Sequence, residues 1–249
     1  MKKLTVFCAA ACLAASAAAQ NHPDLHEVLD RQKGRNLIEI PKGTYTLDVR
    51  SNGPYKFHNL TDIHINGNGS TVICNNQEQA FSFYNCVRVE LRDLTIDYDP
   101  LCFTQGEITA VAEDGSWFDV RIDEGYPVTG LAANRVQFYD PQTRLLKRNS
   151  ITTYTSNYSA LKQLGHNLFR AVKNGTWSAG EQVGDLVVMD VKTDKPNAGV
   201  HTVMLNKCYN TKLENVTVYG SNTFSFFEKE CYANEYRNCA YLAGDTHGF

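Results

Sequence analysis

Three short acidic segments of the sequence contain the residue types that acid–base catalysis needs. Two carboxyl groups on either side of a glycosidic bond can act as general acid and general base. In each segment the two polar residues are two positions apart, so in a strand both would point outward from the same face. The pairs are Asp97 and Asp99 in "IDYD", Glu228 and Glu230 in "FFEKE", and Asp245 and His247 in "GDTHGF".

Among these residues we expect Asp245 and Glu228 to be catalytic. We expect the other four to bind substrate: His247, Glu230, Asp97 and Asp99. Each pair also has a structural explanation, which the sequence leaves open. Asp99 precedes Pro100 and is typical of a turn. Glu228 and Glu230 are also typical of a solvated strand face, and Asp245 and His247 of a loop.

The strands that would carry these side chains belong to a sequence repeat. Four segments share one frame, in which Leu or Tyr is followed by Asp or Asn and then by alternating apolar residues. They are "LTDIHING" (60–67), "LRDLTIDY" (91–98), "LENVTVYG" (213–220) and "YRNCAYLA" (236–243). The alternation is typical of a half-buried strand, and units this short can form a core only when they stack.

The stacked repeat predicts a parallel β-helix, in which Asn side chains at a fixed turn position form a ladder along the axis. We expect four residues to share one interior column: Leu60, Leu91, Leu213 and Tyr236. Leucine-rich repeats are the alternative, but the helical half of each unit is absent. The one clear helix is predicted in "HPDLHEVLDRQKG" (22–34), with Pro23 at its first position.

The second and third copies begin 122 residues apart, at positions 91 and 213, which leaves about a hundred surplus residues between them. Within this stretch "GEITAVAEDGSWFDVRID" predicts an antiparallel hairpin about Asp114-Gly115. We therefore predict an all-β chain: a solenoid interrupted by an inserted, barrel-like antiparallel β module. The predicted divisions are a signal peptide (1–19), a helix cap with the first coils (20–102), the module (103–200) and further coils (201–249).

Charge and the first residues exclude some functions. A net charge of −3 without a basic cluster gives no long-range attraction to nucleic acid, so we expect no such partner. "MKKLTVFCAAACLAASAAAQ" has the form of a secretory signal cleaved after Ala19. We expect an exported protein, located in the periplasm, at the cell surface or outside the cell. No other apolar run approaches the ~20 residues of a membrane span.

Six cysteines follow the signal: Cys74, Cys86, Cys102, Cys208, Cys231 and Cys239. In an oxidising compartment an even number permits disulfides, although the sequence does not decide the pairing. Alternatively, they are small buried hydrophobic residues at a recurring turn. No spacing indicates a zinc site, and we expect no cofactor.

Several segments resemble a known class of proteins. "IPKGTY", "INGNGSTVI" and "YNCVRVELRDLTIDYDP" resemble the pectate-lyase-like right-handed parallel β-helix proteins of carbohydrate breakdown. The interruption after "DYDPLCFTQGEI" and the return at "VHTVMLNKCYNTKLENVTVYGSNTFSFFE" more closely resemble glycoside hydrolase family 110. Those proteins are bacterial α-galactosidases whose β-helix carries inserted β-barrels. The resemblance covers residues 35–249.

The resemblance implies a secreted hydrolase of terminal α-galactosides or similar neutral glycans. It also implies a longer chain with acidic catalytic residues on later coils, so we expect this chain to be a fragment that is inactive alone. Alternatives are a polysaccharide lyase or polygalacturonase, and a non-catalytic glycan-binding β-helix of the cell surface. A lyase should place basic residues beside the acidic cluster, whereas only Lys229 and Arg237 lie near the expected one, which favours a neutral sugar.

Overall fold

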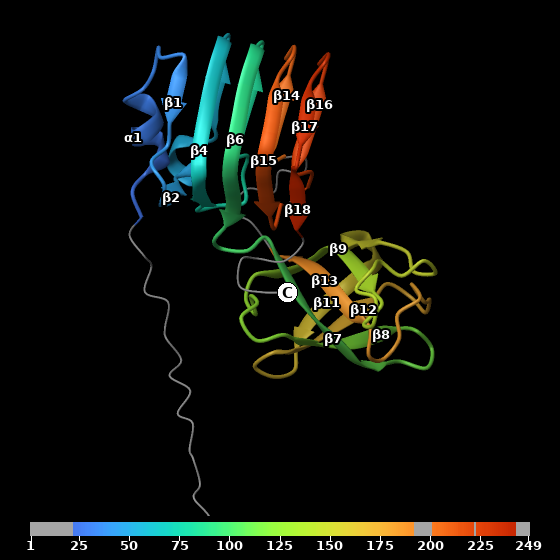
Figure 1. Ribbon diagram of the computed structural model, residues 1–249. Coiled ribbons are helices and arrows are strands. Elements are labelled where there is room, and N and C mark those ends of the chain that lie inside the picture. Colours follow the sequence, from blue (N-terminus) through green and yellow to red (C-terminus); the bar gives the residue numbers. More distant parts are fainter. Residues whose placement is uncertain (1–21, 192–200, 222, 243–249) are drawn as a thin grey trace, which may run out of the picture.

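The structure is a computed structural model that describes residues 22–191, 201–221 and 223–242. It consists of a parallel β-solenoid and a separate antiparallel β module, each with its own hydrophobic core (Figure 1). The predicted all-β class with a solenoid and an antiparallel module is therefore confirmed. The expected signal peptide, 1–19, lies outside the described residues.

Two parallel sheets build the solenoid. The long sheet has seven strands, namely β1 (Leu37–Glu39), β2 (Thr44–Leu47), β4 (Thr61–Cys74), β6 (Val87–Tyr98), β15 (Lys212–Tyr219), β17 (Glu235–Arg237) and β18 (Ala240–Leu242). The second sheet has four, namely β3 (Tyr55–His58), β5 (Phe81–Tyr84), β14 (Val203–Asn206) and β16 (Phe226–Lys229). Each coil contributes one rung to both sheets, except that the last described coil, with β17 and β18, contributes to the long sheet alone.

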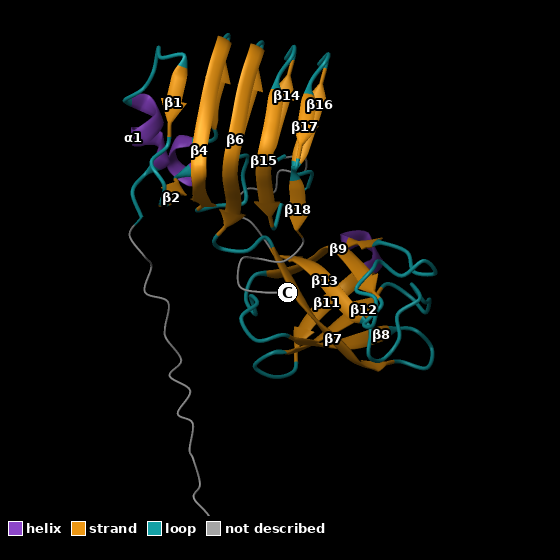
Figure 2. Cartoon of the chain, in the orientation of Figure 1, coloured by secondary structure: helices purple, strands orange, loops and turns teal. Residues whose placement is uncertain are grey.

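Two short helices lie beside the first rung (Figure 2). Helix α1 (Leu25–Asp30) begins after Asp24, whose carboxylate accepts the backbone N–H of His26 at 3.0 Å. Pro23 therefore precedes the cap, and our expectation that it opens the helix is wrong by two positions. Leu29 of α1 is buried in the solenoid core, so this helix covers the first rung. Helix α2 (Val49–Asn52) was not predicted.

The solenoid continues in register across the insertion. Strand β15 pairs in parallel with β6, with Leu213 beside Leu91, and β17 continues the column with Tyr236. The prediction that Leu60 belongs to this column is wrong, because Ile65 pairs with Leu91. The reason is that the repeat frame matches Asp62 with Asp93, whereas Asp62 turns an earlier corner, beside Arg88, and the Leu60 carbonyl accepts the backbone N–H of Val87. A bulge between Asn66 and Ser70 further interrupts the frame in β4.

Each coil turns its corners through residues in the left-handed backbone region. Twelve non-glycine corner residues have φ between 51° and 56°, and they recur at matching places in successive coils. The three columns are Asn59, Asn85, Lys207 and Glu230; Asp62, Arg88, Asn210 and Ala233; and Asn68, Asp93, Asn215 and Asn238. Asn and Asp tolerate this conformation better than most residues, which explains their recurrence in the sequence.

The corner side chains also bond along the axis, as the predicted Asn ladder requires. Asn238 donates to Asn215 at 3.2 Å, and Asn215 donates to Asp93 at 2.8 Å. In another column Asn85 donates to Asn59 at 2.8 Å. The ladder is therefore confirmed, and it satisfies side-chain amides between rungs.

The module is one curved antiparallel sheet ordered β10-β9-β13-β7-β8-β12-β11. Its strands are β7 (Phe103–Val111), β8 (Trp117–Ile122), β9 (Leu131–Tyr139), β10 (Thr153–Tyr154), β11 (Tyr158–Gln163), β12 (Leu168–Lys173) and β13 (Leu186–Val191), with a 3₁₀ turn at Thr155–Asn157. Strand β9 also contacts β11, so the sheet curves toward closure in the barrel-like manner expected. The hairpin about Asp114-Gly115 joins β7 to β8, as predicted.

The two connections of the module to the solenoid lie close together. The Tyr98 hydroxyl, at the end of β6, hydrogen-bonds the Thr202 hydroxyl before β14 at 2.8 Å, although 104 residues separate them. The Cys102 thiol donates to the Gly220 carbonyl at 2.7 Å. The chain therefore leaves the solenoid and returns to it at one place.

Candidate functional site

A pocket of about 370 Å³ lies between the module and the solenoid. Its module wall is the outward face of three neighbouring strands, β7, β13 and β9, and its other wall comes from the solenoid. The principal lining residues are Phe103, Gln105, Asp123, Arg135, Gln137, Tyr139, Arg144, Val188 and Asp190 from the module, and Ser221, Thr223 and Tyr241 from the solenoid.

Strand alternation explains why polar side chains gather there. On β13, Val187 and Met189 are fully buried in the module core, whereas Val188 and Asp190 line the pocket. Val188 pairs with Gln105 on one side and with Gln137 on the other. Three strands that are separate in sequence therefore place one row of side chains across the pocket wall.

Asp190 is the chemically most distinctive residue of the pocket. Burial raises the pKa of its carboxyl to about 6, although the positive charge of Arg135 acts in the opposite direction. Among the described residues, no hydrogen bond is made to the Asp190 side chain. A carboxyl group whose pKa is raised toward neutral pH is suited to general-acid catalysis.

A second carboxyl and two amides complete the polar lining. The Asp123 carboxylate accepts a hydrogen bond from the Gln105 amide at 3.1 Å, and the Tyr139 hydroxyl donates to Gln137 at 3.2 Å. The pocket thus offers donors, acceptors and aromatic rings within a small concave volume. This combination suits a ligand that has many hydroxyl groups and one apolar ring face.

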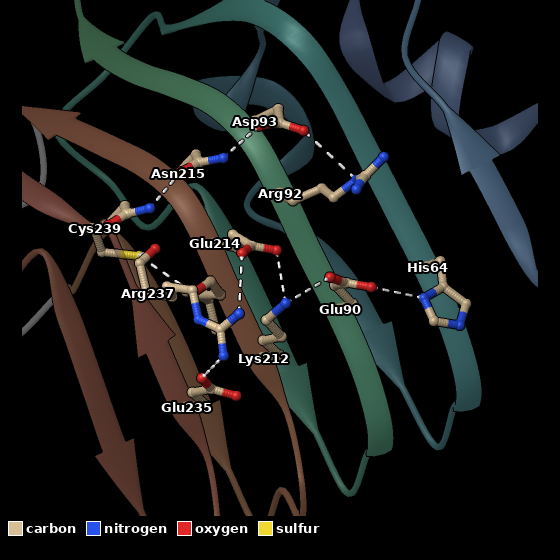
Figure 3. A network of polar contacts seen from close by, with 12 residues as sticks. His64, Glu90, Arg92, Asp93, Lys212, Glu214, Asn215, Glu235, Arg237 and Cys239 are labelled. Carbon is tan, nitrogen blue, oxygen red and sulfur yellow. Dashed lines mark hydrogen bonds and ion pairs between the residues drawn. The ribbon is translucent and has the colours of Figure 1, made fainter.

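A second polar surface covers the outward face of the long sheet, where charged side chains of successive rungs alternate in sign (Figure 3). Glu90 accepts from His64 at 2.9 Å and lies 3.3 Å from the Lys212 amine, which contacts Glu214 at 2.6 Å. Arg237 lies 3.6 Å from Glu214 and continues the row. Because each charge is already compensated by a neighbour, we interpret this surface as a structural ladder rather than a ligand site.

Asp97 and Asp99 lie at the end of β6 and do not line the pocket between module and solenoid. Asp97 is 6% exposed, and its carboxylate accepts the backbone N–H of Tyr98 at 2.8 Å. Asp99 is exposed in the connection to β7, where a turn role was the alternative. Asp97 is therefore buried and Asp99 exposed, so the two carboxyl groups do not share one environment.

Glu228 and Glu230 are both exposed, but only Glu228 lies on β16. Glu228 pairs with Leu205, in the column that contains the buried Phe83, and it accepts a hydrogen bond from the Tyr236 hydroxyl. Glu230 follows the last residue of β16 and has a left-handed backbone conformation. Its carboxylate lies 3.8 Å from the amine of Lys207, which occupies the same corner of the preceding coil. Side chains alternate between the two faces only within a strand, so the spacing of two residues no longer predicts a shared face once Glu230 has a positive φ.

The remaining expected site residues, Asp245 and His247, lie outside the described residues. Sequence reasoning missed Asp190, Arg135 and Tyr139. For Arg135 and Tyr139 a signal was present, since "RVQFY" alternates polar and apolar residues, whereas Asp190 follows the apolar run "LVVM". The sequence did not indicate that these strands are neighbours or that the solenoid covers their outer face.

The chain was also compared with known proteins. No protein-family model matches it, and no curated protein sequence does. Within residues 22–191, 201–221 and 223–242, no helix is long and apolar enough to cross a membrane. Over the same ranges, no three His, Cys, Asp or Glu side chains are grouped so as to hold a metal ion. The functional proposal therefore rests on the fold and on the geometry of the pocket.

Proposed function

We propose that this protein acts on glycans and that the sugar binds in the pocket between the module and the solenoid. The observation that carries the proposal is Asp190, a carboxyl with a raised pKa, in a concave site with a second carboxyl, Asp123. Glycoside hydrolysis commonly uses two carboxyl groups, one of which must be protonated at the start of the reaction.

In this proposal the protonated Asp190 gives its proton to the glycosidic oxygen as the bond to the leaving sugar breaks. Asp123 accepts a proton from a water molecule, whose oxygen forms the new bond to the anomeric carbon. Gln105 and Gln137 bind sugar hydroxyls, and the ring of Tyr139 contacts a sugar face. All five side chains line the same pocket.

The substrate class follows from the resemblance to glycoside hydrolase family 110. A parallel solenoid that carries an inserted antiparallel β module is the architecture that this resemblance implies, and it supports the proposal of a terminal α-galactoside or similar neutral glycan. We propose an exported location on the basis of the signal-like first residues.

A second candidate is supported by the two guanidinium groups of the pocket, Arg135 and Arg144. Arginine pairs well with the carboxylate of a uronic acid. The pocket therefore also suits a polysaccharide lyase or a polygalacturonase, for which we expected basic residues beside the acidic ones.

The test is to measure binding and turnover with the same set of ligands. Calorimetric titration with galactose and galacturonate detects the site even if the chain alone is inactive. Turnover is assayed on nitrophenyl α-galactosides, α-1,3-linked galactosides and polygalacturonate. We expect Asp190→Asn to lower hydrolysis by roughly 100-fold or more while binding changes little.

The control is Glu113→Gln, which removes an exposed carboxylate of the same module outside the pocket. It should leave binding and turnover unchanged. Unsaturated products from polygalacturonate would favour the lyase, and binding without turnover would favour the non-catalytic glycan-binding protein. No binding to any of these ligands would contradict the proposal.

A further inference from the structure

Three cysteines from successive coils stack at one corner of the solenoid. The backbone N–H of Tyr209 donates to the Cys86 carbonyl at 2.9 Å, and that of Tyr232 donates to the Cys208 carbonyl at 3.0 Å. These bonds place Cys86, Cys208 and Cys231 in line, one per rung. All are free thiols in this structure.

The first two thiols lie on neighbouring rungs. Cys86 and Cys208 are both fully buried and their side chains interact, while the Cys86 thiol also contacts the Phe57 carbonyl at 3.0 Å and the Cys208 thiol the Asn206 carbonyl at 3.4 Å. Neighbouring strands of a sheet are about 4.8 Å apart, which lies within the range of Cα separations that a disulfide spans. The third thiol, Cys231, is partly exposed and accepts the backbone N–H of Cys208 at 3.4 Å.

We propose that Cys86 and Cys208 form a dithiol site that closes to a disulfide bond across the insertion, and that Cys231 is the thiol through which the oxidant reaches it. The oxidant is a small-molecule disulfide. The overall reaction converts two protein thiols and one small disulfide into one protein disulfide and two small thiols, so the protein is oxidised and the small disulfide is reduced.

The column provides a route by thiol–disulfide exchange. Cys231 attacks the small disulfide, which releases the first small thiol and leaves a mixed disulfide. Cys208 attacks the Cys231 sulfur and releases the second small thiol. Cys86 then attacks the Cys208 sulfur, which frees Cys231. In each step the proton of the attacking thiol passes to the leaving sulfur.

The environment of Cys86 favours its role as the final nucleophile. The hydrogen bond from Cys208, opposed by burial, lowers the pKa of Cys86, whereas the same contact and burial raise the pKa of Cys208, so Cys86 is the more easily ionised of the two. Burial raises the pKa of Cys231, which makes its thiolate less abundant. Cys74 and Cys102 are buried elsewhere, and burial raises the pKa of each.

The bond would join the rung before the module to the rung after it. Residues 87–207 would then form a covalently closed loop that contains the whole module. Closing a long loop restricts the unfolded chain more than closing a short one, so oxidation should raise the melting temperature of the solenoid.

The experiment treats the folded full-length protein with oxidised glutathione, unfolds it in the presence of an alkylating reagent, and maps the cysteines by mass spectrometry. We expect a crosslinked peptide containing Cys86 and Cys208, lighter than its two parts by two hydrogen atoms, and a higher melting temperature. Cys208→Ala should abolish both changes. Cys231→Ala should give the same crosslink roughly tenfold more slowly.

The matched control is Cys239→Ala, because Cys239, like Cys231, is partly exposed and contacts carbonyl oxygens, whereas Cys231 also accepts the backbone N–H of Cys208. It should leave the rate and the product unchanged. Alkylation of both Cys86 and Cys208 in the oxidised wild-type protein would overturn the proposal, whatever the variants do. A crosslink that stops at Cys208 and Cys231, or an unchanged rate in Cys231→Ala, would also overturn it.

Discussion

The side-chain amide of Asn215 donates a hydrogen bond to the Asp93 carboxylate over 2.8 Å, although the two residues are 122 positions apart in the chain. Both residues turn a corner with φ of 54°. The contact joins the last coil before the insertion to the first coil after it. Corner conformation and ladder bonding therefore depend on the same two side chains.

We expect Asn215→Ala to lower the free energy of unfolding by about 2 kcal/mol. The estimate combines the left-handed strain of alanine, about 1 kcal/mol, with the loss of a hydrogen bond worth a similar amount. Chemical denaturation measures the change. Asn215→Gly keeps the backbone unstrained and should lose less, so equal losses for the two variants would contradict the role of corner strain.

Gly67, in the bulge of β4, allows close approach of two rungs. A Cβ atom there would lie 2.4 Å from the Asp93 carbonyl oxygen and 2.8 Å from a Leu94 methyl group. We expect Gly67→Ala to destabilise the solenoid by about 3 kcal/mol, because backbone must move to admit the methyl group. Gly43→Ala is the control, since its nearest neighbours are at ordinary distances of 3.5 Å and beyond.

The module contains a fully buried ion pair between Lys173 and Glu181. Lys173→Met would leave the carboxylate buried without its partner, and we expect a loss of about 3–5 kcal/mol in module stability. The double variant with Glu181→Met should recover much of that loss. As a control, breaking the exposed Arg31–Glu27 pair by Arg31→Met should cost less than about 1 kcal/mol.

The pH dependence of stability should report on Asp190. Its pKa is raised from 3.8 to about 6 in the folded protein, so between these values the native state binds more protons than the unfolded state. The contribution of this group to stability is therefore greatest below pH 3.8 and decreases as pH rises to about 6.

Comparison of wild type with Asp190→Asn isolates that contribution. From pH 4 to pH 7, wild type should lose on the order of 1–2 kcal/mol relative to the variant, after allowance for solvent screening of a partly exposed carboxyl. Unfolding by denaturant at several pH values measures the difference. A constant difference between the two proteins would show that the Asp190 pKa is not raised.

The solenoid could be predicted because its physical causes are local. Left-handed corners favour Asn and Asp, and half-buried strands alternate, so both features recur in the sequence at each coil. The register of the first copy could not be read in this way. Asp62 lies at the corner of Arg88 and not at that of Asp93, so Ile65, and not Leu60, pairs with Leu91.

The candidate site was harder to predict, because it depends on contacts between distant segments. Nothing local to Asp190 or Tyr139 indicates that their strands are neighbours, and nothing local to Tyr241 indicates that it faces them. Glu228 and Glu230 illustrate the opposite error, since local spacing suggested a pair that a corner in the backbone separates.

The contact between Tyr98 and Thr202 also has a consequence for the order of folding. Pairing β6 with β15 requires the chain to close a loop of more than a hundred residues, and loop entropy makes this slower than pairing β4 with β6. A module that folds first on its own core would hold the ends of that loop together. The inserted domain would then act as a folding template for the second half of the solenoid, so the solenoid beyond it should assemble last.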